Sequence, residues 1–146
     1  MGRTIEELKV GDFEEFSKTV SESDIYLFAG VSGDMNPAHI DEQYAANTFF
    51  KGRIAHGILV GSFISTVIGM KIPGPGTIYL EQQYKFLAPV RIGDTITARV
   101  EVVEIKSEKN KVNLQTRCFN QNGVMVIDGS AVVSPPKQKK TAITDK

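Results

Sequence analysis

The sequence predicts an α+β protein in which one antiparallel β-sheet wraps around one long central α-helix. First, residues 57–70 are apolar nearly all round, so a helix there should be covered on most sides. Second, the chain beyond Pro75 contains four strand patterns in succession, separated by short turn sequences. Third, residues 95–102 alternate polar and apolar side chains, which gives the sheet one wet face and one covered face. A sheet that needs a cover and a helix that needs wrapping complement each other.

The N-terminal part is predicted to be a strand followed by a short helix. Residues 12–20 alternate weakly and form a first strand or an extended arm. Ser21 and Asp24 have the spacing of a capping box, in front of an apolar helix that ends at one of the glycines at 30 and 33. Residues 33–39 are expected to be irregular, because proline disfavours the helical conformation in the residue before it.

After the long helix, the chain is predicted to form a four-stranded meander. The strand patterns are residues 77–87, 94–105, 111–120 and 124–134. Their separators are short and rich in turn residues, which suits hairpins between consecutive strands. Residues 1–135 are therefore expected to form a single domain, and residues 136–146 a disordered lysine-rich tail.

Length and charge limit the possible functions of the chain. At 146 residues it is long enough for one domain with an ordinary core. Lysine plus arginine equals aspartate plus glutamate at 17 each, so no net field favours nucleic acid or a membrane, and a small-molecule partner is expected. No secretory signal or apolar run of ~20 residues is present, and the lone Cys118 excludes an internal disulfide. A cytoplasmic protein is expected.

Two histidines limit the side chains that transfer protons near neutral pH. His39 lies five residues after Asp34 across an irregular segment, where functional residues are common, although a lone histidine is more often structural. His39 and Asp41 form an H-x-D pair, but a zinc site needs three or four ligands and no third is evident, so no metal is expected. Asp41 is suited to cap a brief helix after it.

Gly57 and Ser65 lie on the predicted long helix. The N–H of Gly57 at the helix start has no intrahelical acceptor, so it is able to stabilise an oxyanion; a flexible helix start is the alternative. Ser65 is by default a small polar residue bonded to its own backbone. Cys118 lies in a predicted strand, where a packing role is favoured.

Two segments together resemble a known enzyme family. They are Ser-Gly-Asp-Met-Asn-Pro-Ala-His-Ile-Asp at residues 32–41 and Ile-Ala-His-Gly-Ile-Leu at residues 54–59. They resemble the MaoC-like (R)-specific enoyl-CoA hydratases, and the resemblance runs from about Val10 to Pro135. The ten-residue motif is specific, and its key positions show no departure.

The resemblance implies a hot-dog fold, in which an antiparallel sheet wraps one long helix, assembled as a homodimer or a higher homo-oligomer. Asp34 and His39 would be the catalytic pair, and the Gly57 amide would polarise the thioester carbonyl. Three further positions match residues that line the active site or the acyl pocket: Ser65, Ile68 and Val133. The reaction implied is reversible hydration of trans-2-enoyl-CoA to (R)-3-hydroxyacyl-CoA. It needs no cofactor, because coenzyme A is part of the substrate.

Three alternatives stay open at this point. A 3-hydroxyacyl-[acyl-carrier-protein] dehydratase catalyses the same reaction in reverse. Its carrier protein would bind a basic surface patch, but the candidate residues for such a patch are too scattered to decide: Lys51, Arg53, Lys71 and Lys85. A thioesterase on the same fold would want an acid on the long helix, and residues 57–70 contain none. A non-catalytic acyl-thioester-binding module is disfavoured by the presence of both Asp34 and His39. Acyl chain length, pathway and the division of acid and base roles are left open.

Overall fold

The computed structural model of this chain describes residues 1–138. Its helices are α1 (Glu22–Ser32), α2 (Pro37–Ile40), α3 (Glu42–Ala46) and α4 (Gly57–Met70), with two 3₁₀ turns, η1 (Ile5–Glu7) and η2 (Ser107–Lys109). Its strands are β1 (Phe13–Thr19), β2 (Ile78–Phe86), β3 (Thr95–Lys106), β4 (Lys111–Phe119) and β5 (Met125–Ser134). The α+β prediction is confirmed, and the long helix has the predicted bounds.

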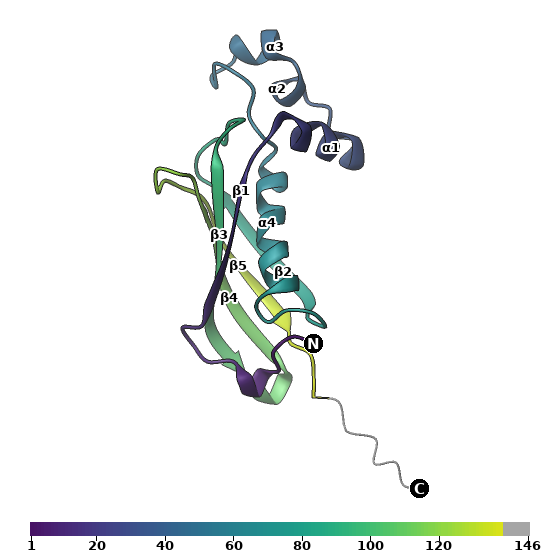
Figure 1. The fold of residues 1–146 in the computed structure, drawn as a ribbon, viewed down its shortest axis with the longest axis vertical. Coiled ribbons are helices and arrows are strands. Elements are labelled where there is room, and N and C mark those ends of the chain that lie inside the picture. Colours follow the sequence, from purple (N-terminus) through teal and green to yellow (C-terminus); the bar gives the residue numbers. More distant parts are fainter. Residues whose placement is uncertain (139–146) are drawn as a thin grey trace, which may run out of the picture.

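The five strands form one antiparallel sheet in the order β1-β3-β4-β5-β2, which curves around α4. Figure 1 shows α4 running along one face of the sheet, with α1, α2 and α3 gathered beyond the end at which α4 begins. This arrangement places the N-terminus of α4 beside the motif-bearing segment between α1 and α3.

The core lies between α4 and the covered face of the sheet. Side chains along β3 and β4 alternate between buried and partly exposed positions, as a half-covered sheet requires. The buried members on these two strands are Ile96, Ala98, Val100, Val102, Val112, Leu114, Thr116 and Cys118. Seven residues of α4 are buried against them. Burial raises the pKa of the Cys118 thiol to about 12, which agrees with the predicted packing role.

The position of β2 corrects the predicted meander. Only β3, β4 and β5 pair in sequence order, whereas β2 pairs with β5 at the far edge of the sheet. The segment after β2 crosses one end of the sheet and does not turn back into a hairpin. Along this path Val90 O accepts from Ala55 N at 2.7 Å, and Gly93 N donates to Val20 O at 2.8 Å. The turn at residues 92–94 therefore leads into β3 beside β1 and does not form a hairpin.

The short helices follow their predicted caps, with one correction. Ser21 Oγ accepts from Asp24 N at 3.1 Å in the expected capping box, and α1 ends at Gly33, whose φ of 81° lies in the left-handed region. Asp41 caps α3 through Tyr44 N, as predicted. The segment expected to be irregular contains α2, because Pro37 occupies the first helical turn, where its missing N–H costs no hydrogen bond.

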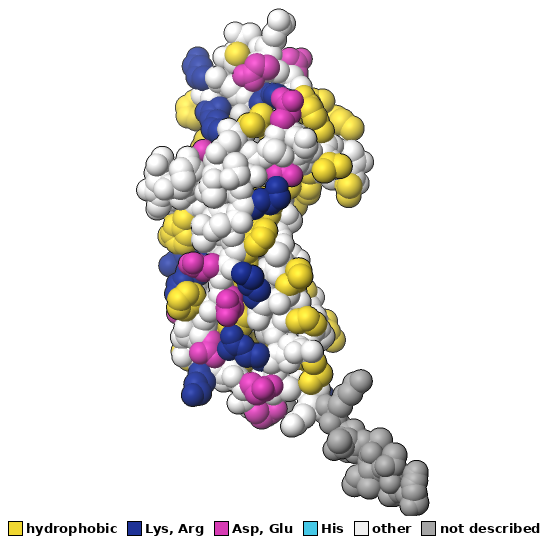
Figure 2. Space-filling view, in the orientation of Figure 1, with side chains coloured by type: hydrophobic (Ala, Val, Ile, Leu, Met, Phe, Trp, Pro, Cys, Tyr) yellow, Lys and Arg dark blue, Asp and Glu magenta, His cyan; other side chains and the backbone are white. Residues whose placement is uncertain are grey.

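The outer surface mixes charges of both signs. Figure 2 shows basic and acidic side chains interspersed along the sheet side of the view, with hydrophobic side chains along the opposite edge. Arg117 pairs with Asp128 at 3.0 Å on this outer face. Over residues 1–138, no helix has both the length and the apolar character needed to cross a bilayer. Pro135 and Pro136 are buried, and residues 139–146 of the predicted tail lie outside the described residues.

Candidate active site

Asp34 lies in a tight turn directly after α1. Ser32 Oγ accepts a hydrogen bond from Asp34 N at 3.1 Å and donates one to Phe28 O at 2.7 Å. The Asp34 carboxylate accepts from Asn36 N at 3.2 Å, a local Asx-type turn. The side chain is exposed, so its second oxygen is free for water or substrate.

His39 lies on α2, which the N-cap Asn36 begins by accepting from Ala38 N at 3.0 Å. The His39 ring is buried at 9% exposure, and its Nδ1 is 2.7 Å from Ile54 O. A carbonyl oxygen only accepts, so Nδ1 carries the hydrogen and Nε2 keeps the free lone pair of the neutral ring. The nitrogen that can take up a proton is therefore Nε2.

His56 lies next to both residues, and the sequence patterns predicted no role for it. The residue is 2% exposed. Its ring stacks on the His39 ring with centroids 3.9 Å apart, and its centroid lies 4.8 Å from that of the Phe28 ring. His56 Nε2 is 3.0 Å from the backbone carbonyl of Asp34. The available signal in the sequence was its place directly before Gly57 as one of only two histidines.

Asp34 and His39 converge as predicted. One atom each from the Asp34 carboxylate, the His39 ring and the His56 ring lie within 4.8 Å of one another. Asp41 of the predicted H-x-D pair is not part of this cluster, because its carboxylate caps α3, and His56 is the additional side chain of a metal-ligating type. The two imidazoles are stacked, however, so their in-plane lone pairs run side by side and converge poorly on one ion. The geometry suits proton transfer to a shared water better than metal coordination.

Gly57 is the first residue of α4, directly after His56. His56 makes no side-chain cap, and among residues 1–138 no side chain accepts from the first-turn N–H groups of this 14-residue helix. A Cβ at position 57 would lie 2.7 Å from a ring carbon of Phe86, so glycine is also required by packing. The structure thus adds a packing reason for glycine at this position, and its role in an oxyanion hole stays a prediction.

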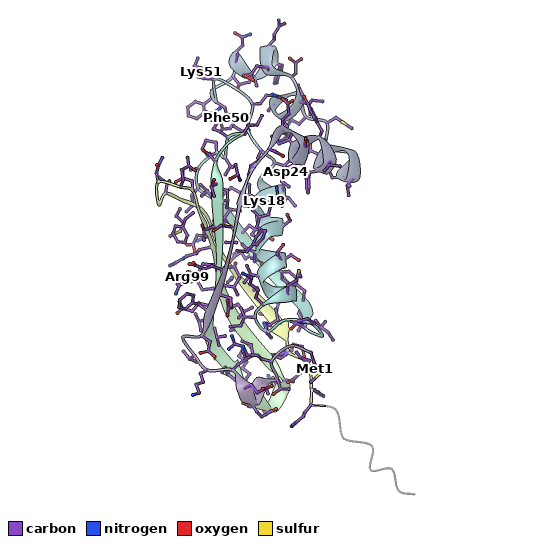
Figure 3. The ribbon with its side chains drawn as sticks, viewed as in Figure 1. Met1, Lys18, Asp24, Phe50, Lys51 and Arg99 are labelled. Carbon is purple, nitrogen blue, oxygen red and sulfur yellow. The ribbon has the colours of Figure 1, made fainter. Side chains whose placement is uncertain are left out.

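An apolar cavity of about 460 Å³ opens beside Gly57. It is lined by the segment before α4, the first turn of α4, the end of β2 with the residues after it, and the start of β5. The lining residues include Phe50, Ala55, Ile58, Phe86, Val90 and Ile127. Phe50 lies in the connection between α3 and α4 (Figure 3). Arg91 holds this connection by donating to the carbonyls of Phe50 and Gly52. An uncharged chain attached to a group at Gly57 would find a matching apolar wall here.

Comparison with known proteins gives the family. The family model "MaoC like domain" matches residues 10–122. This chain belongs to the MaoC-like family. It is 54% identical over 131 residues to an (R)-specific enoyl-CoA hydratase of Rhodospirillum rubrum, covering 90% of each chain. It is 41% identical to the (R)-specific enoyl-CoA hydratase of Aeromonas caviae, covering 88% of this chain and 96% of the relative.

Solved structures of the MaoC-like family confirm the predicted hot-dog fold. The R-hydratase PhaJ1 from Pseudomonas aeruginosa superposes with a TM-score of 0.88 at 48% identity, over 94% of this chain and 88% of that one. The (R)-hydratase from A. caviae superposes with a TM-score of 0.86 at 41% identity, over 88% and 98%. The similarity therefore extends over nearly the whole fold.

The three remaining positions implied by the family resemblance lie away from the Gly57 cavity. Ser65 and Ile68 are eight and eleven residues further along α4, which is about 12 Å and 16 Å of helix. Ser65 is exposed on α4, while Ile68 and Val133 are buried at 2% and 0% exposure. None of the three lines the cavity beside Gly57. Their substrate-binding role stays a prediction.

Proposed function

We propose that this MaoC-like protein is an (R)-specific enoyl-CoA hydratase, a hydro-lyase that reversibly hydrates trans-2-enoyl-CoA to (R)-3-hydroxyacyl-CoA. The observation that carries the proposal is the convergence of the Asp34 carboxylate and the His39 ring beside the uncapped start of α4. The similarity to the R. rubrum and A. caviae hydratases supports the same activity.

The chemical difficulty is that water is a poor nucleophile and the product of its attack is enolate-like. Asp34 and His39 Nε2 hold one water by hydrogen bonds beside C3 of the enoyl group, and the pair accepts one of its protons as the C3–O bond forms. The electron pair of the C2–C3 double bond moves toward the thioester, and a proton from the pair reaches C2 on the same face. Water is thereby added across the double bond, and the pair returns to its starting protonation.

Gly57 supplies the electrostatic part of the mechanism. Charge gathers on the thioester oxygen during attack, and the free N–H at the start of α4 is placed to donate to that oxygen. A single such donor is worth roughly 3–4 kcal/mol of transition-state stabilisation in other enzymes. The proposed machinery consists of the Asp34 carboxylate, the His39 imidazole and the Gly57 amide. It uses no cofactor beyond the coenzyme A of the substrate.

A dehydratase acting on acyl carrier protein is the second candidate. The chain is 39% identical to a mitochondrial 3-hydroxyacyl-[acyl-carrier-protein] dehydratase of Arabidopsis thaliana. Two of the four scattered basic residues are engaged within the described chain: Arg53 pairs with Glu22 and Glu42, and Lys71 donates to Glu15 O. These contacts do not separate the two carriers, because coenzyme A is itself anionic. The identities of 54% and 41% to two (R)-specific enoyl-CoA hydratases favour the coenzyme A thioester.

A homodimer is the proposed assembly. β2 is an edge strand, and it carries exposed apolar side chains at Ile78, Leu80 and Phe86, which is a surface that edge strands of monomers avoid. Ile58 and Met70 add exposed apolar area on α4. Sedimentation equilibrium should give a species of at least twice the chain mass of 16.0 kDa, whereas a monomer at micromolar concentration would reject the assembly. A cytoplasmic location stays a prediction.

The proposal is tested by adding the protein to trans-2-enoyl-CoA substrates of several chain lengths and following the absorbance of the conjugated enoyl group. We expect loss of this absorbance and an (R)-3-hydroxyacyl product on chiral analysis. The same acyl groups on acyl carrier protein measure the second candidate. Release of free thiol would indicate a thioesterase, and tight binding without any absorbance change would indicate a binding module.

A further inference from the structure

His56 occupies the point at which the three proposed catalytic elements meet. Its Nε2 bonds to the backbone of Asp34, its ring stacks on His39, and its peptide bond leads directly into Gly57. We infer that His56 is a positioning residue that fixes the geometry of Asp34 and His39 relative to the start of α4. The inference rests on the proposed hydratase function and deepens it.

The hydrogen-bonding pattern defines the state of the His56 ring. Asp34 O only accepts, so His56 Nε2 carries the hydrogen. The other nitrogen, Nδ1, is buried and has no hydrogen-bond partner among residues 1–138. An unpaired buried polar atom is costly and needs a reason. A leucine or phenylalanine would avoid this cost, but neither would supply the donor that holds the Asp34 carbonyl.

Each catalytic side chain is held from two directions when His56 is included. The Asp34 turn is fixed by its carboxylate accepting from Asn36 N and by its carbonyl accepting from His56. The His39 ring is fixed at its edge by Ile54 O and on its face by the His56 ring. Without His56 the His39 ring is free to tilt about its bond to Ile54. Misplacement of a reacting group by about 1 Å can cost 100-fold in rate.

The simpler reading is that His56 only fills the core at the start of α4. That reading predicts lower stability and an unchanged turnover number for the folded molecules. A positioning role predicts a lower kcat with little change in KM, because the substrate contacts themselves remain. The two readings therefore differ in a kinetic quantity that is independent of stability.

Two substitutions separate the functions of the His56 side chain. His56→Phe keeps an aromatic ring against His39 and Phe28 but removes the donor to Asp34 O. His56→Gln places an amide N–H near the position of Nε2 and removes the ring. We expect His56→Phe to lower kcat for trans-2-enoyl-CoA roughly 10- to 100-fold with KM within about threefold, and His56→Gln to recover part of the loss.

Val67→Ala is the matched control, because Val67 is equally buried on α4 and lies far from the site. It should lower Tm by a similar amount while kcat per folded molecule stays within about twofold of native. If folded His56→Phe and His56→Gln both retain native kcat, the positioning role is wrong. If the loss of activity equals the fraction of variant molecules that is unfolded, His56 only fills the core and the positioning role is wrong.

A second readout does not depend on turnover. The chain has two histidines, so a His56 variant leaves His39 as the only imidazole in ¹⁵N spectra. We expect the native His39 ring to show the tautomer protonated at Nδ1, and the His56→Gln ring to show mixed or broadened signals. Native His39 signals in both variants would overturn the inference. Absence of hydration by the native protein, with these spectra as expected, would reject the proposed function alone.

Discussion

At the residue scale, reactivity depends on which imidazole nitrogen is free. Ile54 O accepts a hydrogen bond from His39 Nδ1. The lone pair on Nε2 is therefore the one on this ring that can accept a proton. One carboxylate oxygen of Asp34 accepts from Asn36 N in a turn, and the residue is exposed. The site thus holds two acceptor groups within 4.8 Å of each other, and both side chains are positioned by backbone hydrogen bonds.

The side chains of the pair can be tested with shape-preserving substitutions. Asp34→Asn keeps an oxygen for the turn, and His39→Asn keeps a donor for Ile54 O, so both variants should fold. We expect kcat to fall by about 10²- to 10⁴-fold in each, because a group that moves a proton is lost. Asp128→Asn, on the outer face of the sheet, is the matched carboxylate control and should retain native turnover. Near-native rates in folded Asp34→Asn or His39→Asn would reject the mechanism.

The sequence was sufficient to predict that Asp34 and His39 lie close together, because they belong to one short local motif. It did not reveal His56, whose hydrogen bond to Asp34 joins residues 22 apart. Nor did it show that Ser65, Ile68 and Val133 lie away from the cavity beside Gly57, since cavity walls come from several elements. Pairings between distant segments depend on the folded path of the chain, which a local pattern does not contain.

At the element scale, two glycines of α4 leave room for two aromatic rings of β2. A Cβ at Gly57 would lie 2.7 Å from Phe86, and one at Gly61 would lie 2.8 Å from Tyr84. Tyr84 Oη also donates to Gly61 O at 3.1 Å. This contact fixes the start of α4 against the sheet, and with it the direction of the Gly57 N–H.

The contact predicts opposite outcomes for two glycines on the same helix. Gly57→Ala should lower the free energy of unfolding by about 1–3 kcal/mol, because the added methyl group overlaps the Phe86 ring. Gly69→Ala meets no atom within 4 Å and should be neutral or stabilise by up to about 1 kcal/mol. Urea denaturation measures both. Adding Phe86→Leu to Gly57→Ala should recover stability; no difference between the two glycines would contradict the packing.

The helix α1, whose end carries Asp34, is anchored at its start by Asp24. Burial alone would raise the pKa of the Asp24 carboxyl, but hydrogen bonds from Lys18 Nζ at 2.6 Å and from Ser21 N outweigh it and hold the pKa below its ordinary value. Figure 3 shows Lys18 and Asp24 close together at the start of α1. A lowered pKa means that the folded state binds this proton less readily than the unfolded chain.

The sign of the pH effect follows from that shift. The contribution of Asp24 to stability is complete above its unfolded pKa and is lost over the acid range, as pH falls from that value through the lower folded one. Asp24→Asn should therefore flatten the fall of unfolding free energy over this range, as measured by denaturant titrations at each pH. Parallel curves for the native protein and the variant would show that Asp24 carries no such linkage.

At the scale of the whole molecule, the wrapped helix was predictable and the strand order was not. Periodicity identified every strand, and the all-round apolar character of residues 57–70 required a covering sheet. The pairing of β2 with β5 was missed, because residues 87–94 carry turn signals but cross the sheet end, through bonds to Val126, Ala55 and Val20. The crossing also brings Val90 beside Ala55 and helps to wall the cavity next to Gly57.

The central claim is that one water, held between Asp34 and His39, adds to a single face of the enoyl group. Hydration of trans-2-enoyl-CoA in D₂O tests it most directly, with the relative configuration at C2 and C3 read from proton NMR couplings. We predict (R)-3-hydroxyacyl-CoA with the C2 deuterium and the C3 hydroxyl on the same face. Product with the two groups on opposite faces, or a mixture of both forms, would contradict the account.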